Sequence, residues 1–393
     1  MSVNSTVFVV AGEPSGDQLG AGLMAALSST NNNRIRFAGI GGEEMVSQGL
    51  TSLFPMAELS VMGLVEVVPR IPLLLRRIKQ TADLINRLQP AAIVTIDSPG
   101  FNFRMVRQLG KINIPIIHYV APTVWAWRPK RAKEMARMFD HLMVLLPFER
   151  KYFEKEGLAC TFVGHPAAKH KDSHSGERFR VKYCLSGSTI LGVFPGSRIS
   201  EIQRMLPVFT DTVRLLQSST PNLHILITIA SGTKNIIEKY INNFSVPVTL
   251  VENRMEKPAA FQACNIALAT SGTITTELAA VGTPMVVGYK MAPVTMAIAR
   301  HVVKVPHITL INLVLGEEVV PEFIQGCCTP MALAEALRTL ITDPHKRSLQ
   351  IERLKDGIHL LGGNEIDPAG RAARVVEAAI QEPIPMKAYP PGK

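Results

Sequence analysis

The sequence predicts an α/β protein with two Rossmann-like domains that face each other across a cleft. Short runs rich in β-branched residues alternate with helical stretches along the chain, which is typical of parallel βαβ units. The strand runs are almost continuously apolar, as expected for sheets that helices cover on both faces. The length of 393 residues corresponds to about two to three domains.

The first domain is expected at residues 1–167. Its first strand run is VFVV, and the loop that follows is rich in glycine. Later runs have the same apolar, β-branched character and are separated by helical stretches. We expect strands at 7–10, 36–40, 92–96, 114–119, 141–146 and 160–163, helices at 18–28 and 43–48, and a further segment near 71–88.

The composition and periodicity of the sequence change after Pro166. Residues 167–176 are polar and lack periodicity, so we interpret them as an interdomain linker. A second alternating series then indicates a second domain at 187–345. Its strands are expected at 189–194, 224–229, 248–251, 266–269 and 285–288, with further helices at 331–342 and 368–381. C-terminal helices at about 350–385 are expected to pack back on the first domain or on a partner subunit.

The composition indicates a globular protein with a basic surface. Hydrophobic residues make up 47% of the chain and charged residues 19%, which is too apolar for a disordered protein. The 42 Lys and Arg exceed the 32 Asp and Glu by 10, a surplus that suits an anionic lipid surface, nucleic acid or a phosphorylated substrate. The sequence contains no apolar run of about 18 residues, no signal-peptide pattern and no CxxC metal spacing. We therefore expect a soluble, cytoplasmic protein without a bound metal.

Ligands bind beyond the carboxyl ends of strands in open parallel sheets, so the loops there are the candidate sites. The first such loop is AGEPSGDQLG, where Gly12 and Gly16 permit a tight turn before a helix whose N–H groups can bind an anion. It lacks the G-x-G-x-x-G fingerprint of dinucleotide sites. The alternative is that Ser15 or Asp17 only caps the helix.

Asp97 directly follows the apolar strand 92–96. Partial burial at the end of a strand raises the pKa of a carboxyl group and makes it a useful general base. The alternative, which the spacing supports equally well, is that Asp97 organises the following Ser-Pro-Gly turn through its side chain.

A candidate diphosphate-binding loop follows the strand 189–194. Gly196, Ser197 and Arg198 precede a helix expected at 201–216, which combines a glycine turn, a helix N-terminus and a bidentate cation. The loop has no GxxxxGK[ST] motif. The alternative for Arg198 is an ordinary surface position.

The loop after the strand 266–269 is the most informative one. Ser271, Gly272 and Thr273 are small and can leave their amides open toward phosphates. Glu277 lies four residues after Thr273, on the same helical face and within reach of a ribose diol. The alternative for Glu277 is that it complements the helix dipole.

Several polar residues have open roles on the sequence alone. Asn312 lies within an apolar run and needs a hydrogen-bonding partner, which is either a ligand or the backbone. His118, His165 and Trp125 are candidates for lining a pocket, and the sequence does not rank them.

The segment 61–79, VMGLVEVVPRIPLLLRRIK, is dense in aliphatic residues and contains four cations. Its two prolines argue against one long core helix. Aliphatic side chains beside Arg and Lys are how a peripheral protein enters the headgroup region of anionic lipid. The alternative is a hydrophobic turn packed under its own domain. The residues expected to contact a membrane are Val65, Val67, Val68, Leu73, Leu74 and Leu75.

Trp125 and Trp127 lie next to a basic run, a combination that can also stack on nucleic acid. However, the basic residues are scattered, aromatic residues make up only 6% of the chain, and the sequence contains no RNA- or DNA-binding motif. We therefore expect no nucleic-acid partner.

Seven short motifs together resemble those of the lipid-A-disaccharide synthases. They are GEPSGD (12–17), IDSPGFN (96–102), VAPTVWAW (120–127), FVGHP (162–166), FPGSR (194–198), ATSGT (269–273) and LINL (310–313). Each motif alone is weak, but seven in order over nearly the whole chain are specific. The one departure is Pro14, where a small residue such as Ala is expected. The segment 271–284 alone would indicate only a nucleotide-sugar glycosyltransferase of the GT-B type.

The resemblance implies an inverting glycosyltransferase with the GT-B fold. The donor would be UDP-2,3-diacylglucosamine and the acceptor 2,3-diacylglucosamine 1-phosphate. The products would be the β-1′,6-linked lipid A disaccharide 1-phosphate and UDP. The resemblance further implies no metal or other cofactor, a peripheral place on the cytoplasmic face of the inner membrane, and a homodimer.

The resemblance also assigns roles to single residues. It implies that Asp97 is the general base. The positions that match the family's substrate-binding residues are Glu13 and Ser15, beside the sugar and acceptor pocket, and Arg198, Glu277 and Asn312, at the donor.

Two other functions stay open on the sequence. A UDP-N-acetylglucosamine-type epimerase, or another GT-B UDP-sugar enzyme, would have the same two-domain shape. An epimerase needs no acceptor, and the aliphatic segment 61–79 would have no purpose in it. A non-enzymatic nucleotide-sugar-binding module would not need Asp97.

Overall fold

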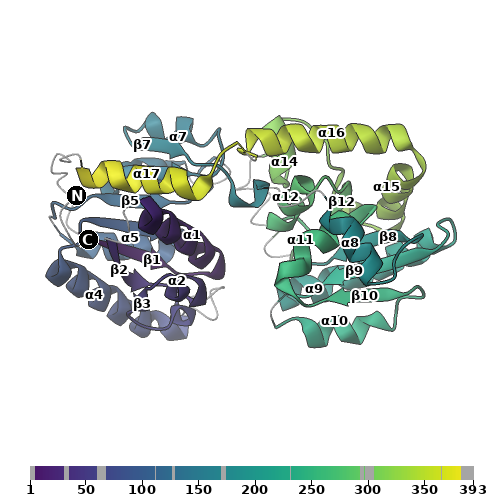
Figure 1. The fold of residues 1–393 in the computed structure, drawn as a ribbon, viewed down its shortest axis with the longest axis horizontal. Helices are drawn as coiled ribbons and strands as arrows, with labels where there is room; N and C mark the ends of the chain where they lie inside the picture. Colours follow the sequence, from purple (N-terminus) through teal and green to yellow (C-terminus); the bar gives the residue numbers. More distant parts are fainter. Residues whose placement is uncertain are drawn as a thin grey trace. The chain divides into compact units, whose positions relative to one another are not determined.

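The structure is a computed structural model that describes residues 5–30, 35–59, 68–110, 112–125, 129–169, 174–230, 232–292, 296, 305–363 and 365–381. The chain divides into two compact units. The first unit contains the residues up to Pro166 and those from Ile366 onward, and the second runs from Ala167 to Glu365. Each unit is built on one parallel sheet (Figure 1).

Within the described residues, the first unit has a seven-stranded sheet of order β3-β2-β1-β4-β5-β6-β7. Its strands are β1 (Ser5–Ala11), β2 (Ile35–Ile40), β3 (Thr51–Ser52), β4 (Ala92–Ile96), β5 (Ile116–Tyr119), β6 (His141–Val144) and β7 (Ala159–Phe162). Its helices are α1 (Pro14–Thr30), α2 (Glu43–Ser47), α4 (Ile71–Leu88), α5 (Pro99–Gln108), α6 (Lys130–Met138), α7 (Arg150–Glu154) and α17 (Pro368–Gln381).

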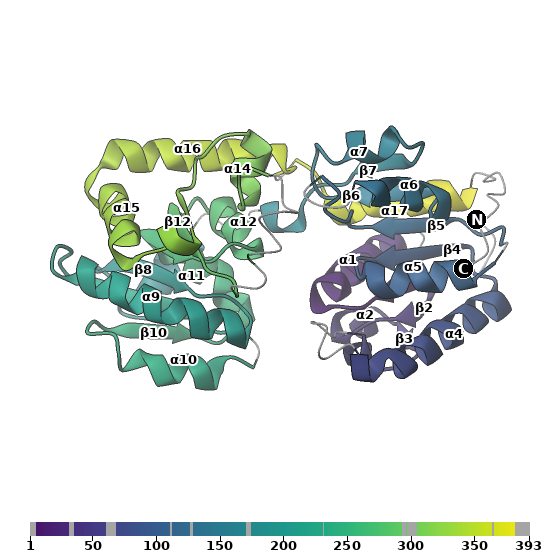
Figure 2. The same ribbon diagram turned by 180° about the vertical axis from the view of Figure 1, so that it is seen from behind.

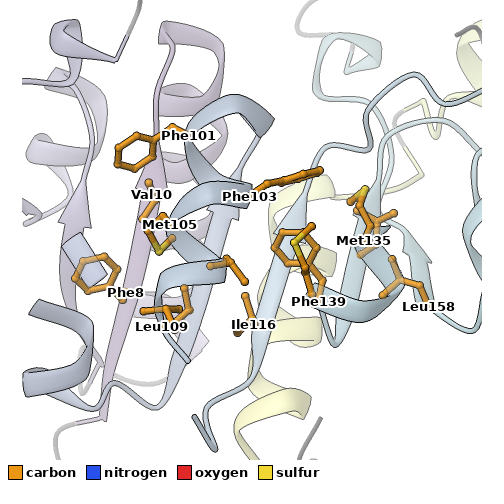
Figure 3. Packing of buried hydrophobic residues seen from close by; sticks show 14 of the residues in the cluster. Phe8, Val10, Phe101, Phe103, Met105, Leu109, Ile116, Met135, Phe139 and Leu158 are labelled. Carbon is orange, nitrogen blue, oxygen red and sulfur yellow. The ribbon is translucent and has the colours of Figure 1, made fainter. Parts of the chain in front are cut away.

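The apolar strands of this sheet are buried on both faces. Phe8 and Val10 of β1 point into a cluster with residues of α4, α5 and α6, among them Phe103 (Figure 3). Val7 and Val9 point to the opposite face, where they pack with α1 and α17. Figures 1 and 2 show these two helix layers from opposite sides. Burial on both faces explains why the strand runs are continuously apolar rather than alternating.

The last helix of the chain belongs to the first unit. α17 lies beside α1, and Ala373 and Val376 are buried in the same cluster as Leu27 (Figure 1). The Arg371 Nη1 atom donates a hydrogen bond to the Phe162 carbonyl at 3.2 Å, which joins α17 to the end of β7. The C-terminal segment is therefore part of the first unit's core.

Within the described residues, the second unit has a six-stranded sheet of order β10-β9-β8-β11-β12-β13. Its strands are β8 (Thr189–Phe194), β9 (Leu223–Thr228), β10 (Val248–Val251), β11 (Ile266–Ala269), β12 (Met285–Tyr289) and β13 (Glu322–Ile324). Its helices are α8 (Ser175–Lys182), α9 (Ile199–Gln217), α10 (Lys234–Ile241), α11 (Lys257–Ala263), α12 (Thr273–Ala280), α14 (Leu310–Leu315), α15 (Pro330–Thr342) and α16 (Pro344–Leu360).

The core of the second unit lies between its sheet and the helices α9 and α15. Phe209 of α9 and Leu337 of α15 are fully buried with Val193 and Leu268 of the strands. α16 lies beside α12 and α14. Its Gln350 side chain accepts a hydrogen bond from the Met285 amide at 2.8 Å and so joins this helix to β12.

Three helices differ from the sequence prediction. α1 begins at Pro14 rather than at residue 18, because proline is well suited to the first turn of a helix. The expectation that prolines exclude a long helix is wrong from Ile71 onward, since Pro72 lies in the first turn of α4, where its missing N–H needs no partner. α8 begins at Ser175, within the stretch expected to be a linker. In the described part of the chain, no helix has the length and apolar character needed to cross a membrane.

Candidate active site

The two sheets share a feature that positions their loops. In the first sheet the chain passes from β1 to β2 on one side, while β4 lies on the other side of β1, and β8 has the same relation to β9 and β11. Ligands of open α/β sheets bind at such topological switch points, outside the carboxyl ends of the strands. Two loops of each unit are therefore candidate sites: those with Glu13 and Ser15 and with Asp97 in the first unit, and those with Gly196 to Arg198 and with Ser271 to Thr273 in the second.

Asp97 lies at the carboxyl end of β4 in an unusual backbone conformation. Asp97 and Ser98 have φ angles of 48° and 43°, in the left-handed region that is unfavourable for residues other than glycine. The Asp97 amide donates to the Tyr119 carbonyl at 2.9 Å, and the Asn102 Nδ2 atom donates to the Asp97 carbonyl at 2.7 Å. Strained backbone that its surroundings hold in place clusters at active sites, which supports a functional role for this turn.

The Asp97 side chain lines a hollow of about 290 Å³. Other residues that line it are Pro99, residues 120–124 and Arg131. Val120 also has a left-handed φ, 78°, which is rare for a β-branched residue. Burial raises the pKa of Asp97, and a hydrogen bond from the Ser98 backbone opposes the rise. A carboxyl group whose pKa is raised toward neutrality is suited to act as a general base.

The loop after β1 approaches the Asp97 turn closely. A Cβ atom at Gly12 would lie 2.4 Å from the Ser98 Oγ atom, so only glycine fits there without a shift. Glu13 lines a second hollow of about 350 Å³ together with Ser98 and Pro99. Ser15 is exposed in the first turn of α1. The structure thus brings Glu13 and the Asp97 turn together.

The second hollow is apolar along the wall that α4 provides. Its lining residues include Leu59, Ile71, Leu74, Leu75, Ile78 and Phe101, and a cation, Arg104, also lines it. Pro99 lines both hollows, so both open beside the turn that contains Asp97.

Asp17 caps a helix, but not the one that the alternative for this residue predicts. Its carboxylate accepts hydrogen bonds from the amides of Gly42, Glu44 and Met45 at 2.7, 3.0 and 3.1 Å. These amides belong to the start of α2, so the capped helix is α2 rather than α1. Asp17 therefore fixes the end of β2 to α1.

The loop after β8 presents Arg198 to solvent. Gly196 has a φ of 117°, and a Cβ atom there would lie 2.8 Å from the Glu201 carboxylate. Arg198 immediately precedes α9, its side chain is 58% exposed, and its Nη1 atom lies 3.1 Å from Glu201 Oε1. The guanidinium is exposed beside a helix N-terminus, and the binding of an anion by Gly196, Ser197 and Arg198 stays a prediction.

The loop after β11 is anchored by its own side chain. The Ser271 Oγ atom donates to the Ile308 carbonyl at 2.8 Å, and Thr273 is the exposed first residue of α12. Glu277 lies one turn further along this helix, half-buried, and its Oε2 atom is 2.8 Å from the Lys257 Nζ atom. The helix thus places Thr273 and Glu277 on one face, as the spacing predicts.

Asn312 is enclosed by the protein. Its Nδ2 atom donates to the Val320 carbonyl at 2.8 Å and to Glu322 Oε1 at 2.9 Å, while its Oδ1 atom accepts from the amides of Val319 and Val320, both at 2.9 Å. The residue has no exposed surface. These bonds match the structural alternative for Asn312, and a direct contact with a ligand would require one of them to break.

The residues with open roles have internal partners. His118 is fully buried, its Nδ1 atom lies 2.7 Å from the Thr95 hydroxyl, and burial lowers its pKa to about 3. Burial also lowers the pKa of His165 to about 4. The Trp125 Nε1 atom donates to Glu149 Oε1 at 3.2 Å. Neither histidine lines the two hollows within the described residues.

The candidate membrane segment is described only in part. Val65, Val67 and Trp127 lie outside the described residues, as does the side chain of Val68. Leu73 and Leu74 are half-buried in α4. The most exposed large apolar side chains of this helix are Ile71 and Leu75, at 44% and 51%, whereas Ile78 and Ile85 are buried. α4 therefore packs one face on its own unit and leaves an aliphatic face at its start.

Comparison with known proteins identifies the family. The sequence model of the family described as "Lipid-A-disaccharide synthetase" matches residues 7–374. A lipid-A-disaccharide synthase of Rhodospirillum centenum is 43% identical over 374 residues, covering 94% of this chain and 93% of the relative. One of Ruegeria pomeroyi is 40% identical over 381 residues, covering 94% of each. The chain belongs to the lipid-A-disaccharide synthetase family.

Solved structures confirm the GT-B fold predicted for this family member. A UDP-N-acetylglucosamine 2-epimerase of Listeria monocytogenes, described as putative, has a TM-score of 0.65 at 12% identity and covers 96% of both chains. MurG of Acinetobacter baumannii has a TM-score of 0.56 at 13% identity, covering 96% of this chain and 100% of its own. The fold is shared by epimerases and transferases, so family membership rather than fold makes this chain a glycosyltransferase.

The sequence analysis missed several residues of the site. Asn102, Arg131, Glu149 and Glu322 were not singled out, although the first lies in the same motif as Asp97. Arg131 lies in the basic run that was weighed only for nucleic acid. The feature of the sequence that could have identified Arg131 is its place as the second residue of a helix that follows a strand and a proline-rich loop.

Proposed function

We propose that this family member transfers 2,3-diacylglucosamine from UDP to the 6-hydroxyl of 2,3-diacylglucosamine 1-phosphate. The anomeric carbon inverts, and the products are the β-1′,6-linked disaccharide 1-phosphate and UDP. The names of its relatives support the joining of two sugars in lipid A. The particular donor and acceptor, and the residues that bind them, are the content of the proposal.

The observation that supports this proposal most strongly is the Asp97 turn. A half-buried carboxyl group lies at a switch point, in a strained conformation, and lines a hollow that can take a sugar headgroup. We assign Asp97 the proton of the acceptor 6-hydroxyl. As that oxygen attacks the anomeric carbon, the proton moves to the carboxylate and the bond to UDP breaks on the opposite face. This single displacement inverts the centre, as in inverting glycosidases.

The donor is assigned to the second unit. UDP leaves with negative charge, which the Arg198 guanidinium and the N-terminus of α12 at Ser271, Gly272 and Thr273 would stabilise. Glu277 would accept hydrogen bonds from the ribose hydroxyls while Lys257 holds its other side. Asn312 would act indirectly, because its amide already organises the turn at residues 319–320.

Both proposed substrates carry acyl chains. The apolar hollow beside Asp97 offers Leu74 and Ile78 to such a chain, while Glu13 lies at its polar side. The exposed start of α4 would contact an anionic membrane surface at the cytoplasmic face of the inner membrane. The homodimer implied by the resemblance stays a prediction, which light scattering of the purified protein tests.

A three-arm assay tests the proposed function. The protein is incubated with UDP-diacylglucosamine alone, with the acceptor alone, and with both, and UDP and disaccharide are measured. The proposal expects disaccharide and an equal amount of UDP only when both substrates are present. Conversion of the donor alone into a second UDP-sugar, without net release of UDP, would indicate an epimerase. Binding without any product would indicate a non-enzymatic module.

A further inference from the structure

The hollow beside Asp97 contains a second charged side chain that the proposed mechanism does not use. Among the described residues that line it, Asp97 is the one carboxylate and Arg131 the one cation. The remaining described walls are Pro99, Val120, Ala121, Pro122, Thr123 and Val124. A ligand that enters this hollow therefore meets a base at one wall and a guanidinium at another.

Local structure orients Arg131 toward this place. It is the second residue of α6 and is half-buried, and its guanidinium carbon lies 5.6 Å from the centre of the Phe103 ring. Phe103 is buried in α5, the helix that begins directly after the Asp97 turn. A guanidinium that lies over an aromatic ring is restricted in its orientation, so less entropy is lost when it binds an anion.

The charge at the start of α6 is unusual for a helix. Lys130, Arg131 and Lys133 lie in the first turns, and the first turn contains no acidic residue. Cations are unfavourable at a helix N-terminus, because the helix dipole is positive there. The sequence therefore keeps positive charge where local structure disfavours it, which points to an anionic ligand.

The two charges in the hollow remain distinct. Burial is the main influence on the pKa of Asp97, which rises although a guanidinium lines the same hollow. A guanidinium in direct contact would lower that pKa instead. Both groups line the hollow of about 290 Å³, which a ligand can occupy.

The proposed acceptor contains two groups that match the two charged residues of the hollow, a phosphate for the guanidinium and a hydroxyl for the carboxylate. A glucosamine 1-phosphate has a dianionic group at one end of the sugar and a primary alcohol at the other. Arginine binds phosphate through two parallel hydrogen bonds. We propose that Arg131 binds the phosphate of the acceptor and thereby presents its 6-hydroxyl to Asp97. This inference rests on the proposed function and adds the residue that selects a phosphorylated acceptor.

Two acceptors that differ only in the phosphate test the inference. Transfer to diacylglucosamine 1-phosphate and to diacylglucosamine, both in mixed detergent micelles, is measured as kcat/KM for the wild type and for Arg131→Gln. The variant should lose about 10- to 100-fold on the phosphorylated acceptor, the range of a charge-assisted hydrogen bond. Its activity on the acceptor without phosphate should stay within about twofold of the wild type.

The matched control is Arg137→Gln, which removes an exposed arginine from the same helix. This control should keep the wild-type preference for the phosphorylated acceptor. If Arg131→Gln unfolds because it loses its contact with Phe103, Arg131→Lys replaces it. The lysine variant keeps the charge but not the bidentate fork, and we expect it to lose about tenfold of the preference.

Each outcome decides the question. An unchanged preference in the Arg131 variants overturns the inference, and so does an equal loss on both acceptors, which would indicate a structural role. If the wild type transfers to the acceptor without phosphate as well as to the phosphorylated one, the inference fails while the proposed transferase function stands. If the wild type forms disaccharide from neither acceptor, the proposed function itself fails.

Discussion

The turn after β4 in the first unit and the turn after β11 in the second occupy the same position in their sheets. Each follows the strand that lies next to the first strand of its unit, on the side opposite the second strand. The two turns are nevertheless held in different ways. The Asp97 turn is held in strained backbone conformations, whereas the Ser271 turn is held by a side-chain hydrogen bond to Ile308.

In the second unit, the segment to which Ser271 donates its hydrogen bond is itself held by a carboxylate. The Glu322 carboxylate accepts hydrogen bonds from the amides of Ile308 and Thr309 at 2.9 and 2.8 Å and from the Thr309 hydroxyl at 2.7 Å. It also accepts one from Asn312 at 2.9 Å. A loop fixed in this way can present its amides to a diphosphate without rearranging, which is the preorganisation that stabilises a charged leaving group.

The first unit holds the Asp97 turn through backbone carbonyls and, among the described residues, leaves a neighbouring amide oxygen unsatisfied. The Nδ2 atom of the neighbouring Asn102 donates hydrogen bonds to the carbonyls of Ile96 and Asp97. Within the described residues, the Oδ1 atom of Asn102 is buried without a hydrogen-bond partner. Asp97 is thus fixed through its backbone, and its side chain lines a hollow. The difference between the units teaches that a base needs a fixed backbone and a side chain that still reaches a hollow, whereas a phosphate site needs fixed backbone amides.

The largest expected effect is a loss of catalytic activity when the Asp97 turn of the first unit is changed, while UDP binding, assigned to the second unit, stays intact. Asp97→Asn should lower kcat by about 10²- to 10⁴-fold, the usual contribution of a general base. Asparagine tolerates left-handed backbone, so the turn should keep its shape. Calorimetry should find the affinity for UDP unchanged, because the donor is assigned to the second unit.

The matched control for Asp97 is Asp83→Asn, which makes the same change at an exposed position of the first unit. It should keep both kcat and the melting temperature. Turnover near that of the wild type in Asp97→Asn, with donor binding intact, would remove Asp97 from the mechanism.

The pH dependence of the free energy of unfolding tests whether Glu149, the hydrogen-bond partner of Trp125 next to the Asp97 hollow, is protonated in the folded protein. Glu149 is 3% exposed, accepts hydrogen bonds from Trp125 Nε1 and the Leu146 amide, and has its pKa raised from 4.5 to about 7 by burial. The folded protein therefore holds a proton that the unfolded chain releases between these pH values. The stability this group contributes is fully present below pH 4.5 and is lost as the pH rises through about 7.

The free energy of unfolding should consequently fall between pH 4.5 and 7 by up to about 3 kcal/mol through this one group. Glu149→Gln cannot titrate and should remove that part of the slope in denaturant titrations. Glu154→Gln, on the exposed side of α7, is the control that should keep the wild-type slope. A slope that is the same in wild type and Glu149→Gln would show that Glu149 is charged in the fold.

The sequence was sufficient to predict the strands and the loops that contain the candidate site residues. Runs such as 92–96 and 266–269 are recognisable because both faces of each strand are buried, and a switch point needs only the strand order. The strained φ angles at Asp97 and Val120 could not be predicted, because bonds to Tyr119 and Met143 of other strands hold them.

The role of Asn312 also depended on distant residues. Its partners Val319, Val320 and Glu322 lie in a turn and at the start of β13, and no sequence pattern predicts that this segment folds back on Asn312. Arg131 was overlooked for a related reason, since its meaning comes from Phe103 and Asp97 rather than from its basic neighbours. Tertiary contacts thus decided which polar residues line a site and which stabilise the fold.

A smaller effect should appear in the second unit alone. Arg198→Ala should raise the dissociation constant of UDP by about tenfold, at the low end for a charge-assisted bond because the guanidinium is 58% exposed. Arg214→Ala is a close control, since Arg214 lies on the same helix, is 56% exposed and is paired with Asp211 three residues earlier at 2.8 Å. Calorimetry that gives equal UDP affinity for both variants would remove Arg198 from the donor site.

The smallest effect concerns the outer surface of the first unit. Replacing both Ile71 and Leu75 by Ser removes the exposed aliphatic face of α4. Binding to vesicles that contain anionic phosphatidylglycerol should weaken about tenfold, because less apolar area enters the lipid. The melting temperature and the affinity for UDP should stay the same, since Ile78 and Ile85 form the buried face of this helix.

The control for this pair is Val181→Ser in the second unit, an aliphatic side chain that is 72% exposed on α8. It should leave vesicle binding unchanged, because we assign membrane contact to the first unit only. Flotation with neutral phosphatidylcholine separates the contribution of Arg76 and Lys79, exposed on the same helix, from that of the aliphatic face. Equal binding of all three proteins would place the membrane contact elsewhere, whereas a loss of folding in the α4 variant would show that its aliphatic face is part of the core.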